Sequence, residues 1–215
     1  MPSNLVKVKH GVVGIRLQNE LKGQSCIKFT VIPSSKKETC VSRSFSRAVT
    51  NKEDLRQSIA KHVVRASEKL RKQKQRARRI SVFTRTSSYV STFYSKVATK
   101  KLNIPSNNTS ILLTEALALT EQIYRPHVPL IKAGVLMQDL QKMDYLQQNL
   151  FESANLKKEL NQIHLMALID NLNKRYGRDT ITWASCGTHN VWEMRQEKLS
   201  SASTTRYEEI PIVNV

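Results

Sequence analysis

Residues 52–86, KEDLRQSIAKHVVRASEKLRKQKQRARRISVFTRT, decide the expected fold because the spacing of apolar side chains changes within them. From Lys52 to Lys72 an apolar residue returns every three or four positions, which is typical of a helix with one buried stripe. This stripe consists of Leu55, Ile59, Val63, Ala66 and Leu70. Between Arg79 and Thr86 the period shortens to two, with Ile80, Val82 and Thr84 on one side and Ser81, Phe83 and Arg85 on the other. The segment therefore predicts a helix that packs its stripe against a strand.

The neighbouring segments repeat these two periods. We expect further strands over 37–45, 96–104 and 130–140, and a second helix from the cap at Asn107 and Asn108 to Tyr124. The order is then β-α-β-β-α-β. It predicts an α+β domain in which a four-stranded, mostly antiparallel sheet carries two helices on one face and leaves the other face open to solvent or a ligand.

The remaining segments are less regular. We expect a short helix over 12–22, a third helix over 155–176, a short strand near 180–183, a helical turn over 191–199 and an extended end over 209–213. The polar residues after position 140 predict an exposed tether. The chain is thus divided into a short N-terminal part (1–32), the sheet domain (33–140), the tether (141–154) and a small helical C-terminal extension (155–215).

Positive charge is concentrated in the first part of the sheet domain. The 215 residues carry a formal net charge of +18, and residues 33–103 alone contain 19 Lys or Arg against 4 Asp or Glu. Such asymmetry indicates a polyanionic partner, with a solvated basic helix face as the alternative. A membrane surface is disfavoured because the basic helix has no Trp or Phe on its apolar side. Without a long apolar run or a leader-like start, a cytoplasmic location is expected.

Metal and nucleophile chemistry is not expected of this chain. The three cysteines, Cys26, Cys40 and Cys186, are far apart and have no metal-ligand spacing. A pair of Cys186 and His189 lacks further ligands and an orienting acid. We predict no catalytic residue and no metal site.

Several motifs, taken in order, resemble the C-terminal half of Y-family DNA polymerases of the UmuC type. They are Cys40-Val-Ser-Arg-Ser-Phe-Ser-Arg47, Phe83-Thr-Arg-Thr-Ser87, Lys132-Ala-Gly-Val135, Gln147-Gln-Asn-Leu-Phe151, Asn173-Lys-Arg-Tyr-Gly-Arg-Asp-Thr180, Trp192-Glu-Met-Arg-Gln-Glu-Lys-Leu-Ser200 and Thr204-Thr-Arg-Tyr-Glu-Glu-Ile-Pro211. The resemblance covers essentially the whole chain. It implies the end of a thumb domain, a little finger domain at 33–140 and the C-terminal extension of this polymerase type.

The little finger domain of this family grips the primer and template backbone beside a lesion. The resemblance therefore implies a DNA-binding role for the sheet domain. Arginines at strands or strand ends can follow phosphates without sequence preference. The expected DNA-binding residues are Arg43, Ser44, Arg47, Arg85 and Thr86.

The pentapeptide from Gln147 to Phe151 resembles the motif through which these polymerases bind the sliding clamp. Leu150 and Phe151 would fill an apolar groove, with Gln147 and Asn149 completing the motif. The extension is similar to the part of UmuC thought to contact the processed UmuD dimer and the RecA filament. Trp192, Met194 and the third helix could equally form a small packed subdomain.

In the family, the region that this chain resembles follows the catalytic palm domain, whose carboxylates hold two Mg²⁺ ions. Residues 1–103 contain only five acids, and none forms a paired motif after a strand. We therefore expect the chain alone to need no cofactor and to lack polymerase activity. The leading interpretation is the DNA-binding and clamp-tethering portion of an error-prone translesion polymerase in SOS repair and mutagenesis. The alternatives are a stand-alone protein that antagonises polymerases by occupying clamp or DNA, and a basic RNA-binding domain.

Overall fold

The structure is a computed structural model that describes residues 2–27, 29, 35–89, 93–143, 156–188, 192–194 and 198–212. The chain divides into two compact units, Met1–Ser35 and Lys36–Val215. No helix in these described ranges is long and apolar enough to cross a bilayer.

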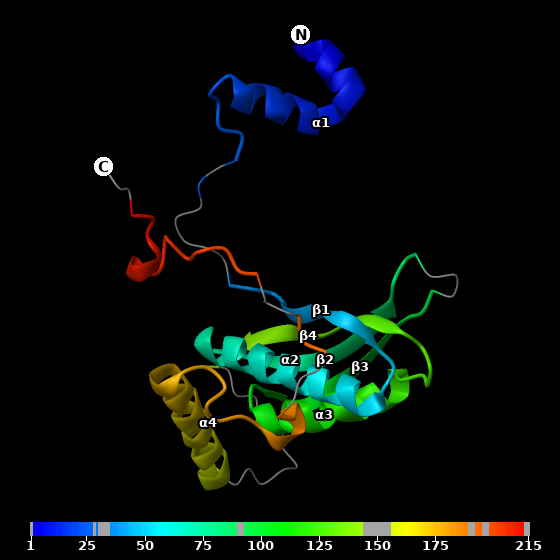
Figure 1. Ribbon diagram of the computed structural model, residues 1–215, viewed down its shortest axis with the longest axis vertical. Helices are drawn as coiled ribbons and strands as arrows, with labels where there is room; N and C mark the ends of the chain where they lie inside the picture. The colour runs from blue at the N-terminus through cyan, green and yellow to red at the C-terminus, as the bar shows by residue number, and fades with distance from the viewer. Residues whose placement is uncertain are drawn as a thin grey trace. The chain divides into compact units, whose positions relative to one another are not determined.

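The second unit is built on one antiparallel sheet. Its strands are β1 (Thr39–Val49), β2 (Gln75–Thr86), β3 (Ser95–Ser106) and β4 (Leu130–Lys142), in the order β1-β4-β2-β3 (Figure 1). The predicted α+β class and β-α-β-β-α-β order are confirmed, although β1 ends four residues later and β2 begins four residues earlier than expected. The sheet places β1 and β3 at its edges.

Two helices cover one face of this sheet, α2 (Lys52–Lys72) and α3 (Thr109–Ile123) (Figure 1). Each begins at an asparagine whose side chain accepts a hydrogen bond from a backbone N–H two residues ahead, at 2.9 Å for both Asn51 and Asn108. Such caps satisfy donors that a helix start otherwise leaves without partners. Both predicted helices are therefore confirmed.

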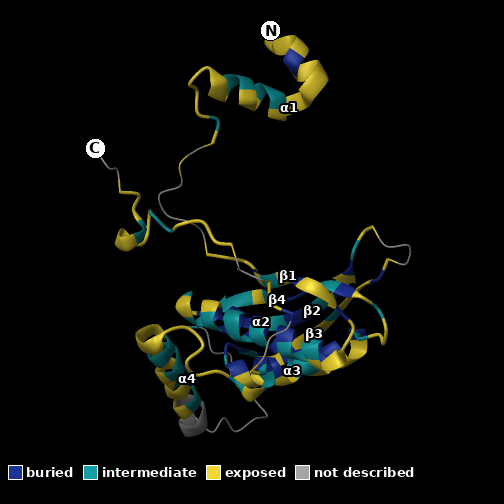
Figure 2. Ribbon diagram, in the orientation of Figure 1, coloured by how far each residue is buried: buried dark blue, intermediate teal, exposed yellow. Residues whose placement is uncertain are grey.

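The core lies between these helices and the sheet, where buried residues gather (Figure 2). Leu55, Ile59 and Leu70 of the predicted stripe are completely buried. The sheet meets them with the fully buried side chains of Ile80, Val82, Thr84, Ala133, Val135 and Met137. The period-two pattern of β2 thus identified the inner face of the sheet correctly.

Gly134 shapes the opposite, open face at the centre of β4. A Cβ at this position would lie 2.6 Å from Cζ of Phe83 and closer still to Cβ of Ser42. These two residues are its cross-strand neighbours on β2 and β1. Without a side chain at Gly134, the half-buried Phe83 ring can lie against the sheet.

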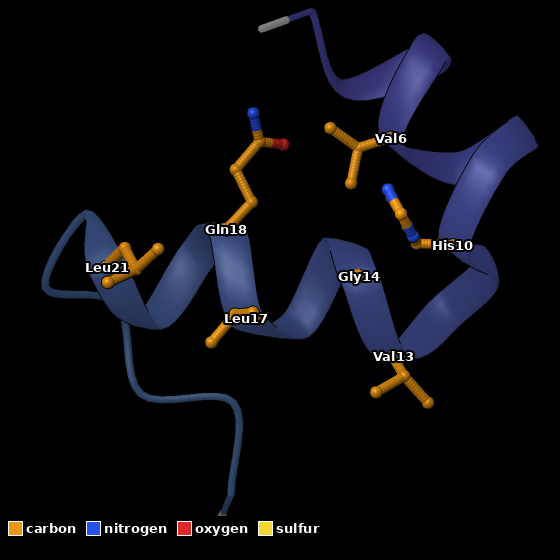
Figure 3. Close-up of a pocket in the computed structure, with 7 residues that line it drawn as sticks. All are labelled: Val6, His10, Val13, Gly14, Leu17, Gln18 and Leu21. Carbon is orange, nitrogen blue, oxygen red and sulfur yellow. The ribbon is translucent and has the colours of Figure 1, made fainter.

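The first unit contains α1 (Ser3–Leu21), which bends at Gly11. Gly11 has φ 62° and ψ −155°, a conformation that favours glycine, and it separates two helical arms. Gly14 lets the arms approach, because an added Cβ would lie 2.5 Å from Cβ of His10. Val6 and His10 face Gln18 across the hollow between the arms (Figure 3). The helix expected over 12–22 is therefore only the second arm.

The C-terminal extension contains α4 (Leu156–Tyr176) and two 3₁₀ turns, Ala184–Cys186 and Tyr207–Glu209. The strand expected near 180–183 is wrong. The backbone N–H of Ile181 donates to the Asn173 side chain at 2.8 Å, and the same side chain donates to the Ile181 carbonyl at 2.9 Å. A side-chain amide on α4 therefore takes the place of a partner strand. The turn expected over 191–199 lies partly outside the described residues.

We predict that Gly134→Ala destabilises the domain by about 1–3 kcal/mol, the usual cost of overpacking a close-packed position. The new methyl group would displace the Phe83 ring and press on Ser42. Urea unfolding followed by circular dichroism measures the change. In a Phe83→Leu background the same substitution should cost less, because the shorter leucine side chain lacks the ring atoms that the new methyl group would meet. An equal cost in both backgrounds would contradict this packing.

Candidate nucleic-acid interface

One row of polar side chains crosses the open face of the sheet. Ser44 of β1 pairs with Lys132 of β4, Lys132 pairs with Arg85 of β2, and Arg85 pairs with Ser95 of β3. Directly paired residues of antiparallel strands point to the same face. We call Ser44, Lys132 and Arg85 the basic row. Their residue type and spacing suit phosphate oxygens rather than a small apolar ligand.

The middle of the open face is less charged. Phe83 lies against Gly134, and farther along the strands the Ser81 hydroxyl lies 2.8 Å from the Thr99 hydroxyl. The Ser81 hydroxyl also donates to the Gln138 side chain at 3.1 Å. These side chains form a neutral, largely hydrogen-bonded stretch. The middle of the open face therefore carries no charged side chain among these residues.

A second pair of cations lies beyond this stretch. Arg79 of β2 pairs with Lys101 of β3 and Gln138 of β4 on the same face. The Arg79 guanidinium makes an ion pair of 3.2 Å with Asp139. Lys101 is exposed. The open face thus carries positive charge at two levels separated by the neutral stretch.

Only some of the DNA-binding residues predicted from the sequence lie on the open face of the sheet. Ser44 and Arg85 share the basic row, and Arg47 is exposed on β1. Arg43 instead pairs with Ala133, on the helix-covered side of the sheet. Thr86 is 1% exposed, and its hydroxyl oxygen accepts a 2.9 Å hydrogen bond from the Tyr94 N–H, so its side chain is not at the surface.

Sequence reasoning missed Lys132 as a site residue. The signal was present in the alternation of β4, where Lys132, Gly134 and Leu136 occupy one face. Only the pairing with β1 and β2 shows that Lys132 stands between Ser44 and Arg85. The predicted clamp-binding residues Gln147, Asn149, Leu150 and Phe151 lie outside the described residues.

Part of the positive charge in residues 33–103 is used within the fold. Eight of these cations make ion pairs among the described residues. They are Lys52, Arg56, Lys61, Arg65, Arg71, Lys72, Arg79 and Lys100. The charge concentration seen in the sequence therefore combines cations held in ion pairs, six of them on α2 and two on the sheet, with further surface cations on the sheet.

The extension attaches to the outer side of α2 by three of these ion pairs. Arg71 donates two hydrogen bonds, at 2.6 and 2.8 Å, to the carboxylate of Asp170 on α4. Arg65 pairs with Asp179 at 2.7 Å, and Lys61 pairs with Glu193. A paired two-oxygen arrangement such as that of Arg71 is the more directional form of this interaction. The parts of the extension that carry Asp170, Asp179 and Glu193 therefore pack on α2.

Trp192 anchors this attachment near β1. It is 2% exposed, and its ring contacts Phe45 and His62 in edge-on geometry, with ring centroids 6.1 and 6.3 Å apart. Cys186 is also buried, and burial raises the pKa of its thiol. No group of three or more potential metal-ligating side chains occurs among the described residues.

Comparison with known proteins shows which family the chain belongs to. Residues 36–150 match the impB/mucB/samB family C-terminal domain. The chain belongs to the impB/mucB/samB family. Residues 164–213 of this family member also match a domain of unknown function, DUF4113.

The relatives of this impB/mucB/samB family member include three named proteins. It is 35% identical over 208 residues to Protein SamB of Salmonella typhimurium, covering 96% of this chain and 48% of SamB. It is 35% identical to Protein MucB of Escherichia coli over 99% of this chain and 50% of MucB. Protein UmuC of Salmonella typhimurium is 31% identical over 96% of this chain and 49% of UmuC. The chain thus spans about half the length of these relatives.

We predict that His62 makes the stability of this domain depend on pH. Burial is the main cause that lowers its pKa from 6.5 to about 4, and the positive charges of Arg43 and Lys61 contribute to the same shift. The unfolded chain takes up a proton below about pH 6.5, whereas the folded chain resists it until about pH 4. The contribution of His62 is therefore present above pH 6.5 and lost as the pH falls to 4, at about 1.4 kcal/mol per pH unit and on the order of 3 kcal/mol in total.

Urea unfolding of the wild-type chain and of His62→Gln between pH 7 and 4 measures this contribution. The difference between the two proteins cancels the carboxylates that also titrate in this range. The wild-type free energy of unfolding should fall more steeply than that of the variant. Parallel curves would show that His62 is not shielded from protonation.

Proposed function

We propose that this chain is the DNA-binding portion of an error-prone translesion DNA polymerase that acts in SOS repair and mutagenesis. The observation that carries the proposal is the basic row on the open face of the sheet. Membership of the impB/mucB/samB family supports the polymerase context. The same face would serve a stand-alone protein that competes with polymerases for DNA.

The geometry favours a grip on the DNA backbone over recognition of bases. Lys132 and Arg85 are neighbours across a strand pair, so their side chains start roughly 5 Å apart and can reach adjacent phosphate oxygens. The Ser44 hydroxyl adds an uncharged donor at the same level. Contacts of this kind position a protein on DNA without specifying sequence. That property suits a polymerase that must accept damaged templates.

RNA binding by base stacking is less favoured. Phe83 is the aromatic side chain on the central strand β2, and it lies against Gly134. Its ring therefore serves the packing of the open face, whereas single-stranded RNA readers present aromatic faces for stacking. Backbone contact through cations remains the function that the residues of this face support best.

We further propose that Gln147, Asn149, Leu150 and Phe151 bind the sliding clamp. The support is the resemblance of the pentapeptide to the clamp-binding motif and its place between β4 and α4. Two adjacent apolar anchors filling a groove would supply most of the affinity. The processed UmuD dimer and RecA are proposed partners of the extension, on the resemblance alone. The chain itself is proposed to use no Mg²⁺ and to catalyse no nucleotidyl transfer.

We predict that Arg85→Ala and Lys132→Ala each weaken DNA binding by a similar factor on unrelated sequences. Each removes one phosphate contact, so the slope of log affinity against log salt should fall by about one unit. Fluorescence anisotropy with labelled primer–template DNA at several salt concentrations measures both quantities. Lys69→Ala is the control, because it removes an equal charge from the exposed side of α2. Equal losses in all three variants would refute a role for the open face.

We predict that replacing Leu150 and Phe151 together by alanine abolishes clamp binding. Both apolar anchors of the motif would be lost while the charge of the chain stays the same. Pull-down with the purified β sliding clamp measures the interaction. The control is Leu165→Ala, which truncates an exposed leucine on α4 outside the motif. Retained binding by the double variant would refute the assignment.

A further inference from the structure

The extension makes one backbone contact with the strand that carries Ser44. Strand β1 follows β4 in register from Thr39 to Ser44, loses that register, and pairs again at Val49. Within this irregular stretch the N–H of Ser46 donates to the carbonyl of Trp192 at 3.2 Å. The extension thus supplies a hydrogen-bond acceptor at the place where the regular ladder with β4 is interrupted.

Trp192 is held at this place from three sides. Phe45 of β1 and His62 of α2 contact its ring, and the Lys61 ammonium lies 5.8 Å from the ring centroid. The neighbouring Glu193 forms the ion pair with Lys61. The Trp192 segment therefore joins β1 to α2 through one backbone hydrogen bond, one buried ring and one ion pair.

Two polar atoms in this contact are not satisfied by the described residues. The indole N–H of Trp192 and Nε2 of His62 are both buried without a hydrogen-bond partner in that part of the chain. Buried polar atoms without partners reduce the stability of the arrangement that buries them. The contact is consequently weaker than its buried area alone would suggest, and it is suited to open and close.

The contact lies beside the proposed DNA grip. Ser46 is two residues from Ser44, the β1 member of the basic row, and Arg47 follows directly. Between Ser44 and Val49 this edge strand lacks its regular pairing with β4, so loss of the hydrogen bond from Ser46 to Trp192 would remove a restraint on it. Release of Trp192 would therefore displace Ser44 and Arg47 relative to Lys132 and Arg85.

We propose that the Trp192 segment is an intramolecular clasp whose docking on β1 and α2 sets the DNA affinity of the open face. Trp192 and Glu193 are positioning residues in this mechanism, because they act through β1 and touch no DNA. A partner that captured the extension would weaken the grip on DNA. This inference rests on the proposed DNA-binding function and assigns a role to part of the segment that matches the domain of unknown function.

Glu193→Lys in the full 215-residue chain gives the decisive test. The variant replaces the Lys61 ion pair by repulsion and opens the clasp, while it raises the net charge by two. Simple electrostatics predicts tighter DNA binding, whereas the clasp predicts at least threefold weaker binding. Glu208→Lys is the matched control, because it makes the same charge change at an exposed position of the 3₁₀ turn. Its affinity should stay the same or increase.

Amide hydrogen exchange in the absence of DNA measures directly whether the Trp192 segment is docked on β1. The Ser46 N–H should exchange faster in Glu193→Lys and in Trp192→Ala, and Trp192→Phe should restore part of the protection and of the DNA affinity. Asp170→Asn, which loosens α4 at Arg71, should lower the melting temperature, leave Ser46 exchange unchanged and leave DNA affinity the same or slightly higher.

The outcomes separate the two proposals. If Arg85→Ala weakens DNA binding while Glu193→Lys binds as tightly as Glu208→Lys, the clasp is refuted and the DNA-binding function stands. If the wild-type chain binds no DNA, the proposed function fails and the coupling fails with it. Unchanged Ser46 exchange in Trp192→Ala would refute the docking itself.

Discussion

Burial of the apolar stripe of α2 is the interaction on which the rest of the domain depends. Leu55, Ile59, Val63 and Leu70 are completely enclosed between the helix and the sheet. Full burial of such side chains contributes about 1.5–3 kcal/mol each. It also fixes the rotation of α2, since the stripe must face the strands. The cations on the remaining sides of α2 are thereby directed outward.

That orientation links the sheet domain to its extension. With the stripe inward, Lys61, Arg65 and Arg71 face away from the core and meet Glu193, Asp179 and Asp170. These are partly exposed ion pairs, and Arg71 with Asp170 is the most enclosed of them. Their role is to position the extension, because they hold Trp192 and α4 against one side of α2. The charge of α2 therefore organises the protein itself, and the sheet carries the cations that are suited to DNA.

Much of the fold could be predicted from local patterns. The periods of β2 and α2 and the asparagine caps depend on residues a few positions apart, and the structure confirms them. The strand expected at 180–183 fails because a period-two pattern does not show whether a partner strand exists. Asn173 occupies the partner position instead. Likewise, the sequence indicated Ser44 and Arg85 by residue type, but it could not show that Lys132 stands between them.

The sequence by itself determined the strands and helices of the sheet domain, the excess of positive charge and the family motifs, because each is a property of near neighbours or of composition. Tertiary structure decided which cations form ion pairs within the protein and which remain on the open face of the sheet. Helix packing covered the face of the sheet to which Arg43 belongs and left the face of Ser44 open, and Lys61 met Glu193, 132 positions away. Register and long-range packing arise from the simultaneous burial of many side chains, and no short window of sequence contains that information.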